Sequence, residues 1–299
     1  MIRIIQHRKI WYTFSGVLVV GAVVALVLWG LRFGIDFTGG SLLEVQFNNN
    51  RPALDKMQQA VDSLNLGTYS IQPSAEQNAL LRFKESDQAT KDKVIKSLSD
   101  ASGGTVTEKR FESVGPVIGD ELKTQALWAI VLSLFFIISY IAWAFRKVSR
   151  PVSSWKYGVS AIIALVHDLL ITIGVFAVLG HYLGVEIDSL FVSAILTVLG
   201  FSVHDTIVVF DRTRENLFRH ATKDFEETVN KSVNDTLSRS INTSLTTLLV
   251  LLSLFFLGGD TIKYFALALV VGITVGTYSS IFIASPLLVE WQRFTKNNR

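Results

Sequence analysis

The chain has 299 residues, of which 49% are hydrophobic and only 18% are charged. Soluble domains carry about 25% charged residues, so this composition argues against an ordinary cytosolic enzyme. The net charge of +3 does not indicate a nucleic-acid-binding protein, because the basic residues lie between long apolar runs and form no single patch. The chain has no cysteine, which excludes disulfides, thiolate metal sites and cysteine nucleophiles.

Six apolar segments are long enough to cross a membrane as helices. A bilayer core is spanned by roughly 20 helical residues. The first apolar run is longer than the apolar part of a signal peptide and no A-x-A cleavage site follows it, which favours an uncleaved membrane anchor. The predicted spans are residues 11–30, 122–145, 159–179, 190–210, 240–257 and 264–289.

Lysine and arginine are concentrated in alternate connections between these spans, which predicts the orientation of the chain. The opposite connections are poor in basic residues, with only Lys263 between the fifth and sixth spans. We therefore expect a multi-pass protein of the plasma (inner) membrane with both termini in the cytoplasm. The basic residues on the predicted cytoplasmic side are Arg3, Arg8, Lys9, Arg146, Lys147, Arg150, Lys156, Arg212, Arg214, Arg219, Lys223, Lys231, Arg293, Lys296 and Arg299.

The polar segment between the first two spans predicts a small extracytoplasmic domain over residues 34–121. Its hydrophobic periodicity indicates a strand-helix-strand-strand-helix-strand order, which is the ferredoxin-like α+β pattern. That fold hosts many functions, and the segment has neither cysteine nor histidine. We expect a folded head that contacts another protein or supports the membrane part. The predicted elements are strands 41–47, 68–72, 79–84 and 105–114, with helices 53–66 and 88–101.

The predicted organisation is thus an α-helical membrane protein with six transmembrane helices and one external domain between the first and second helices. Residues 1–33 form the tail and first span, residues 34–121 the external domain, and residues 122–299 a five-helix membrane domain with a cytoplasmic tail.

Two acids lie inside predicted spans and are candidate functional groups. A charge at the bilayer centre costs at least about 2.5–3.5 kcal/mol, so such residues face the interior of a helix bundle. Asp205 lies six residues before Asp211, which we expect at the cytoplasmic surface, and Arg239 opens the fifth span from the same side. We expect Asp205 and Arg239 to lie close enough to pair. Asp205 is either a titrating proton carrier or a static group, that is, part of an ion pair or a satisfied acid of the core.

Asp168 in the third span is either a second relay step or an acid hydrogen-bonded to neighbouring serine and threonine. The histidines before the two acids, His167 and His204, are either packed bundle histidines or relay groups. No H-x-x-x-H or HExxH spacing supports a metal site.

Small and polar residues mark the last two spans. Arg239, Asn242, Thr243 and Thr246 share one helical face, so we expect a polar stripe towards the interior, either along a hydrated path or as packing between helices. Gly272 begins a G-x-x-x-G sequence that permits close helix contact within this chain or with a partner. Residues 211–238 predict either an amphipathic helix on the membrane face or a solvated loop helix.

Three motifs together resemble the SecF family, which supplies one subunit of the SecDF protein-export complex in the resistance-nodulation-division superfamily. They are G-I-D-F-T-G-G at residues 34–40, F-E-S-V-G-P-V-I-G at 111–119 and S-V-H-D-T-I-V-V-F-D-R-T-R-E-N at 202–216. The resemblance implies pairing with SecD into a twelve-span unit. That unit assists the SecYEG translocon, with SecA and YajC nearby, in moving unfolded preprotein by means of the proton-motive force. It also implies that the superfamily's proton-carrying aspartate is Asp205 and that the associated arginine is Arg239.

The resemblance implies no enzyme activity, cofactor, metal or nucleic-acid partner. Besides its protein partners, we expect the chain to contact membrane lipid. Two alternatives stay open, namely a passive subunit that stabilises SecD and a small-molecule proton antiporter of the same superfamily. No G-x-x-x-x-G-K-[ST] loop is present, which argues against nucleotide hydrolysis in this chain.

The two junctions between membrane and external domain are rich in glycine, and we expect them to act as hinges. Glycine relieves steric limits where the chain turns. A direct role of the first junction in substrate binding is the alternative. The residues of the first junction, after the first span, are Gly34, Asp36, Phe37, Gly39 and Gly40, and those of the second junction, before the second span, are Gly115 and Pro116.

Overall fold

The computed structural model describes residues 2–67, 69–74, 76–84, 87–146, 152–219 and 224–297. The chain divides into two compact units, one of Phe33–Ala126 and one of Met1–Arg32 with Leu127–Arg299. The predicted cytoplasmic residues Lys147, Arg150, Lys223 and Arg299 and the side chain of Lys296 lie outside the described part.

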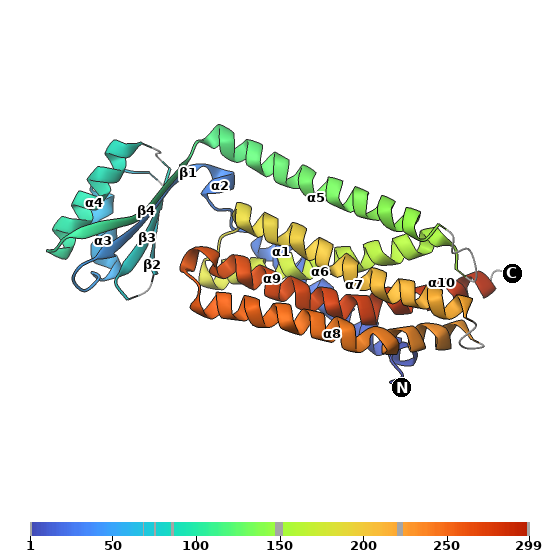
Figure 1. Cartoon of the computed structure of the whole chain (residues 1–299). Coiled ribbons are helices and arrows are strands. Elements are labelled where there is room, and N and C mark those ends of the chain that lie inside the picture. Colours follow the sequence, from blue (N-terminus) through green and yellow to red (C-terminus); the bar gives the residue numbers. More distant parts are fainter. Residues whose placement is uncertain are drawn as a thin grey trace. The chain divides into compact units, whose positions relative to one another are not determined.

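The second unit is helical, and within the described residues six helices are long and apolar enough to cross a membrane, as predicted. Figure 1 shows α6, α7, α8 and α9 side by side, and packing among them forms most of the helical core. The helices are α1 (Arg8–Trp29), preceded by the short η1 (Ile5–His7), α5 (Pro116–Ala144), α6 (Ser154–Leu183), α7 (Ser189–Phe218), α8 (Phe225–Leu257), and α9 (Asp260–Ser279), which continues through η2 (Ser280–Ala284) into α10 (Ser285–Asn297).

The helices differ in how much of their apolar surface the chain itself buries. The share of buried residues in the apolar window is 56% for α6 but 6% for α5 and 17% for α8. A helix that is apolar all round and unburied in water would be unstable, whereas lipid or a partner helix accommodates such a surface. The interior of the unit is therefore built around α6, α7 and the last helix, while α5 and α8 present faces outwards.

The predicted G-x-x-x-G sequence is used within this chain. A Cβ atom on Gly272 would overlap the side chain of Val198 on α7, and one on Gly276 would lie 2.8 Å from the Cβ of Ser202. Both glycines are therefore needed for the close approach of α9 to α7.

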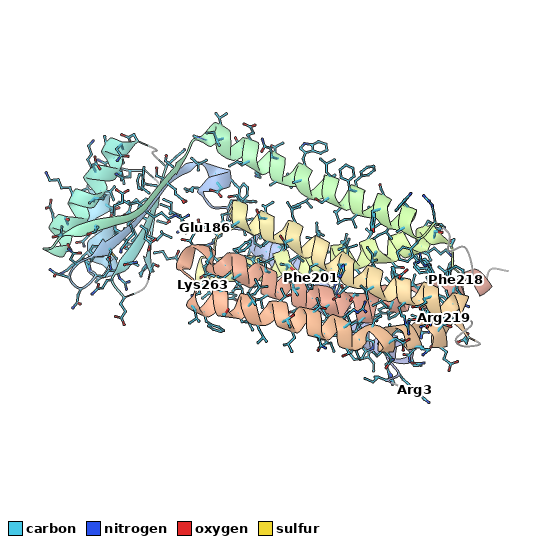
Figure 2. All side chains as sticks on the ribbon, viewed as in Figure 1. Arg3, Glu186, Phe201, Phe218, Arg219 and Lys263 are labelled. Atoms are coloured by element: carbon cyan, nitrogen blue, oxygen red, sulfur yellow. The ribbon has the colours of Figure 1, made fainter. Side chains whose placement is uncertain are left out.

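Alternate connections lie at opposite ends of the helical unit, as six antiparallel spans require. In Figure 2, Glu186 and Lys263 lie at one end, whereas Arg3, Phe218 and Arg219 lie at the other. The N-terminal segment and the basic connection after α7 therefore share one end of the bundle.

The prediction for residues 211–238 was wrong for the described part of this range, because residues 211–218 and 225–238 belong to two membrane helices. α7 continues to Phe218 and α8 already begins at Phe225. The extension of α7 has no glycine or proline to stop it and carries supporting ion pairs at helical spacing, from Arg214 to Asp211 (2.7 Å) and from Arg219 to Glu215 (2.7 Å). The sixth span differs as well, because residues 280–284 wind as a π-helix that the apolar pattern gives no sign of.

The first unit is the predicted ferredoxin-like domain. Its four strands form one antiparallel sheet in the order β2-β3-β1-β4. Alternate β1 residues such as Leu43 and Val45 are fully buried beneath the two helices, whose Met57 and Val94 complete the core. The predicted strand 68–72 starts at a residue outside the described part. The elements are α2 (Ile35–Thr38), β1 (Gly40–Phe47), α3 (Leu54–Asp62), β2 (Tyr69–Ser74), β3 (Asn78–Phe83), α4 (Gln88–Ser102) and β4 (Val106–Val114).

Candidate functional site

Asp205 lies inside the helical unit, on the face of α7 that meets α8 and α9. Its side chain is buried, and the residue is only 3% exposed. Ser240 of α8 and Thr277 of α9 face its carboxyl group. Among the described residues, neither its Oδ2 atom nor the Oγ atom of Ser240 has a hydrogen-bond partner. An acid held in this way keeps an oxygen free to accept a proton.

The expected pairing of Asp205 with Arg239 was wrong within this chain. Among the described residues, the ionisable side chain that interacts electrostatically with the Asp205 carboxyl group is His204. Arg239 lies well inside α8, which begins at Phe225, and its side chain is exposed. The reason is geometric, because neighbouring helical residues point about 100° apart and it is Ser240 that faces Asp205.

The polar stripe of α8 also faces the other way from the prediction. Arg239, Asn242, Thr243 and Thr246 do share a face, but all four are exposed on the chain. The hydroxyls of Thr243 and Thr246 bond back to carbonyl oxygens of their own helix. The periodicity identified a common face correctly and could not tell which of the two polar faces of α8 points inwards.

The inward face of α8 carries two serines that the sequence interpretation did not single out. Ser240 and Ser244 are buried, and Ser244 lies 2.5 Å from the hydroxyl of Thr277 on α9. Their spacing of four residues places both on one face of the helix, which the sequence could have indicated. The neighbouring stripe has four polar residues and was therefore the stronger pattern.

Asp168 lies near the middle of α6 and is fully buried. Its Oδ2 atom accepts hydrogen bonds from Ser202 of α7 (2.5 Å) and Ser279 of α9 (2.8 Å). Its Oδ1 atom is 2.9 Å from the Nδ1 atom of His167. Asp168 is thus hydrogen-bonded to serine side chains from two other helices.

Residues 276–279 of α9 connect the surroundings of the two acids. Thr277 faces Asp205, whereas Ser279 donates to Asp168. Gly276 between α9 and α7 lets Ser202 reach Asp168. A change in the position of α9 at this turn therefore alters contacts of both acids.

The two histidines have different environments. His167 is buried against Asp168, whereas His204 is exposed beside Asp205. In the part of the chain that the structure describes, no three His, Cys, Asp or Glu side chains gather as a metal site.

The glycine-rich junctions pack against each other within the unit Phe33–Ala126. Gly39 has a φ of +71°, and a Cβ atom there would lie 2.7 Å from the Cα atom of Pro116. Gly40 has a φ of +121°, and its Cβ would lie 2.8 Å from the carbonyl oxygen of Phe83. Only glycine combines these backbone angles with such close approach.

The residues before Gly39 form the single turn α2. Gly34 caps this turn, and Phe37 is buried at its end. Asp36 is half-buried on the same turn, and Gly115 accepts a hydrogen bond from the backbone of Gly119. The motif thus builds a compact turn held against the start of α5.

These features define a class, a six-span membrane protein with a ferredoxin-like domain after its first span and buried acids between its helices. Residues 93–294 match the family described as protein export membrane protein SecD/SecF, C-terminal. Residues 29–50 match the SecD/SecF GG motif. The chain belongs to the SecD/SecF family.

Individual relatives agree with this assignment. The chain is 45% identical to the protein translocase subunit SecF of Thermobaculum terrenum, over 98% of this chain and 94% of the relative. It is 40% identical to the SecF subunit of Anaerolinea thermophila, with the same coverage of both chains. These similarities extend over nearly the whole sequence and identify the SecF type within the family.

The fold matches a solved structure of the same kind. The crystal structure of SecDF from Thermus thermophilus, a translocon-associated membrane protein, superposes with a TM-score of 0.83 and 32% identity, over 99% of this chain. This chain spans 38% of the length of that SecDF chain. A SecDF crystal structure in a super-membrane-facing form gives a TM-score of 0.70 at 33% identity. The predicted six-span fold with one external domain is confirmed.

Proposed function

We propose that this protein is the SecF-type half of a SecDF assembly that uses the proton-motive force to assist protein translocation. Family membership supports a role in protein translocation and partnership with SecD, and its relatives are named as translocase subunits, a transport role. The observation that carries the proton-driven part is Asp205, an acid buried between three helices with an oxygen that lacks a hydrogen-bond partner among the described residues. A buried ionisable group in a membrane segment is a candidate for ion or proton transfer.

Protonation of Asp205 would remove a charge from the contact between α7, α8 and α9. One proton that crosses the membrane releases about 2.3 kcal/mol per 100 mV. A bias of a few kcal/mol is enough to shift a two-state equilibrium strongly. Ser240 and Thr277 are the side chains positioned to respond, because they face the carboxyl group from the neighbouring helices. Asp168 is the second group of the same proposed path.

Arg239 has a proposed role in proton transfer from the exposed surface of α8 and not from the interior of the helical unit. Exposure of a charged arginine to the centre of a lipid bilayer costs about 2.5–3.5 kcal/mol in free energy. The three polar side chains beside Arg239 would add to this cost. The exposed stripe of Arg239, Asn242, Thr243 and Thr246 is therefore covered by helices of SecD, and Arg239 pairs with an acid there. The arginine thus contributes to proton transfer across the subunit interface.

The junction residues couple the membrane unit to the external domain. Gly39 and Gly40 pack on Pro116 and Phe83, so the entering and leaving chains move together at this point. The turn before Gly39 contains Gly34, Asp36 and Phe37, and Gly115 lies directly before Pro116 on the leaving chain. We propose that the chain bends next to this packed junction. Movement of the external domain, residues 34–121, is the proposed output of the proton cycle.

The proposed setting is the plasma membrane, with both termini in the cytoplasm. The support is the charge asymmetry, because the end that carries Arg3 and Arg219 in Figure 2 is rich in basic residues. The proposed further partners are SecYEG with SecA, YajC, the unfolded preprotein and membrane lipid.

The test is the Asp205→Asn substitution in full-length protein assembled with SecD. Export of a secretory protein into membrane vesicles is measured after SecD copurification is checked. Asp211→Asn is the matched control, because Asp211 lies six residues further along the same helix and is exposed. We expect export to fall for Asp205→Asn only. Unchanged export with an intact assembly would favour a passive subunit that stabilises SecD, whereas export of a small molecule would favour an antiporter.

A further inference from the structure

The buried pair of His167 and Asp168 has a geometry that fixes which atom can accept a proton. The carboxylate accepts from two serine hydroxyls, Ser202 at 2.5 Å and Ser279 at 2.8 Å, both on its Oδ2 atom. With Oδ2 occupied by two donors, the Oδ1 atom is left to accept the hydrogen of the imidazole at 2.9 Å.

The imidazole that satisfies this arrangement carries its hydrogen on Nδ1. In a neutral imidazole one nitrogen is a donor and the other is an acceptor, so Nε2 then presents a lone pair. Among the described residues the Nε2 atom of His167 has no hydrogen-bond partner, and the residue is only 6% exposed. A carboxylate bonded to Nδ1 orients such a ring and stabilises its imidazolium form.

The groups around the ring leave Nε2 free for a proton. Tyr278 of α9 stacks on His167 with ring centroids 6.3 Å apart. Its hydroxyl donates to the carbonyl oxygen of Trp11 and accepts from Ser15 of α1, each at 3.2 Å. Among the described residues, the titratable groups that contact the imidazole are Asp168 from its own helix and Tyr278 from α9. The neighbouring helices contribute neutral serines to these two groups, Ser202 of α7 to Asp168 and Ser15 of α1 to Tyr278.

We propose that the Nε2 atom of His167 is a proton-binding site of the helical unit, separate from Asp205. The lone pair of Nε2 forms an N–H bond with a proton delivered by water, and no bond of the protein breaks. Binding of this proton raises the net charge of the His167–Asp168 pair by one. The inference rests on the proposed function for its physiological driving force and assigns the atom that holds the proton at the second acid.

The test is the ionisation of His167 in the full chain assembled with SecD in lipid vesicles. Histidine is labelled with nitrogen-15, and the ring signals are followed by solid-state NMR from about pH 9 to about pH 5, the range in which histidine charge changes. The sequence has five histidines, so one signal disappears in His167→Asn and is thereby assigned. Asparagine keeps a donor at the position of Nδ1 and has no group that takes a proton. His204→Asn is the matched control on the neighbouring helix.

We expect the His167 signal to show the Nδ1–H tautomer at high pH and the imidazolium form at low pH. A ring that stays neutral throughout, or that carries its hydrogen on Nε2, would overturn the proposal. If His167→Asn does not assemble, a chain in which the other four histidines are asparagine carries the His167 signal alone.

The outcome is separable from that of the proposed function. Titration of His167 together with normal export by Asp205→Asn would contradict the proposed function and leave this site standing. Loss of export in Asp205→Asn with a permanently neutral His167 would contradict this site alone.

Discussion

The packed junction of the external domain makes a sharp prediction for Gly39→Ala. Gly39 and Gly67 both have a positive φ, of +71° and +69°, but Gly39 also has a ψ of 167°, a combination that is essentially restricted to glycine. An alanine at Gly39 costs about 1–3 kcal/mol in backbone strain. At Gly67 nothing lies within 4 Å of the added Cβ, whereas at Gly39 the Cβ would meet Pro116 backbone at 2.7 Å. Overpacking of this kind adds about 1–3 kcal/mol.

Gly67→Ala therefore controls for a positive φ alone, and the additional effect at Gly39 contains the contact with Pro116 together with the strain from its ψ of 167°. Hydrogen exchange of sheet amides in the full-length protein measures it, because opening of the domain exposes them. We expect exchange in Gly39→Ala to be at least about 5-fold faster than in Gly67→Ala, because the contact alone adds at least about 1 kcal/mol. Equal exchange in the two variants would refute the close packing of Gly39 against Pro116.

Two further predictions concern the helical unit and the external sheet. Gly276→Ala brings a Cβ to 2.8 Å from the Cβ of Ser202, so we expect the free energy of unfolding, measured by thermal unfolding, to fall by about 1–3 kcal/mol. Gly200→Ala on α7 is the control, because its Cβ meets nothing within 4 Å. Similar melting temperatures of the two variants would contradict the α7–α9 contact. The hydrogen bond from Tyr69 to Asp62 raises the pKa of Tyr69 to about 12. Because this folded pKa lies above the ordinary value of about 10, the contribution to stability is complete below about pH 10 and is lost as the pH rises through about 12. Ultraviolet titration of phenolate should lose its component near 12 in Tyr69→Phe, and a Tyr69 that titrates like a free phenol would contradict the bond.

The sequence predicted the elements of this protein better than the directions in which they face. Apolar length alone predicts six spans, and alternation predicts the strand at residues 41–47, where Leu43 and Val45 of β1 are buried in the structure. Burial cost alone singled out Asp168 and Asp205, and both are buried. These features depend on one segment at a time, which is the information that hydrophobic periodicity carries.

The errors arose where several helices had to be placed together. Arg239 and Ser240 are neighbours in sequence, and only the packing of α8 on α7 decides that the serine faces Asp205. The serines around Asp168 come from α7 and α9, which are remote in sequence, so no local pattern indicates them. The π-helical turn after Ser279 likewise leaves no trace in an apolar sequence.

The central claim is that Asp205 couples the proton-motive force to export. The most direct measurement is the ratio of export rates with and without an imposed proton gradient, in vesicles that contain the complete SecDF assembly. We predict that this ratio exceeds one for the wild-type chain and for Asp211→Asn, and falls to about one for Asp205→Asn because the buried proton acceptor is gone. A gradient that stimulates export through Asp205→Asn as strongly as through the wild-type chain would contradict it.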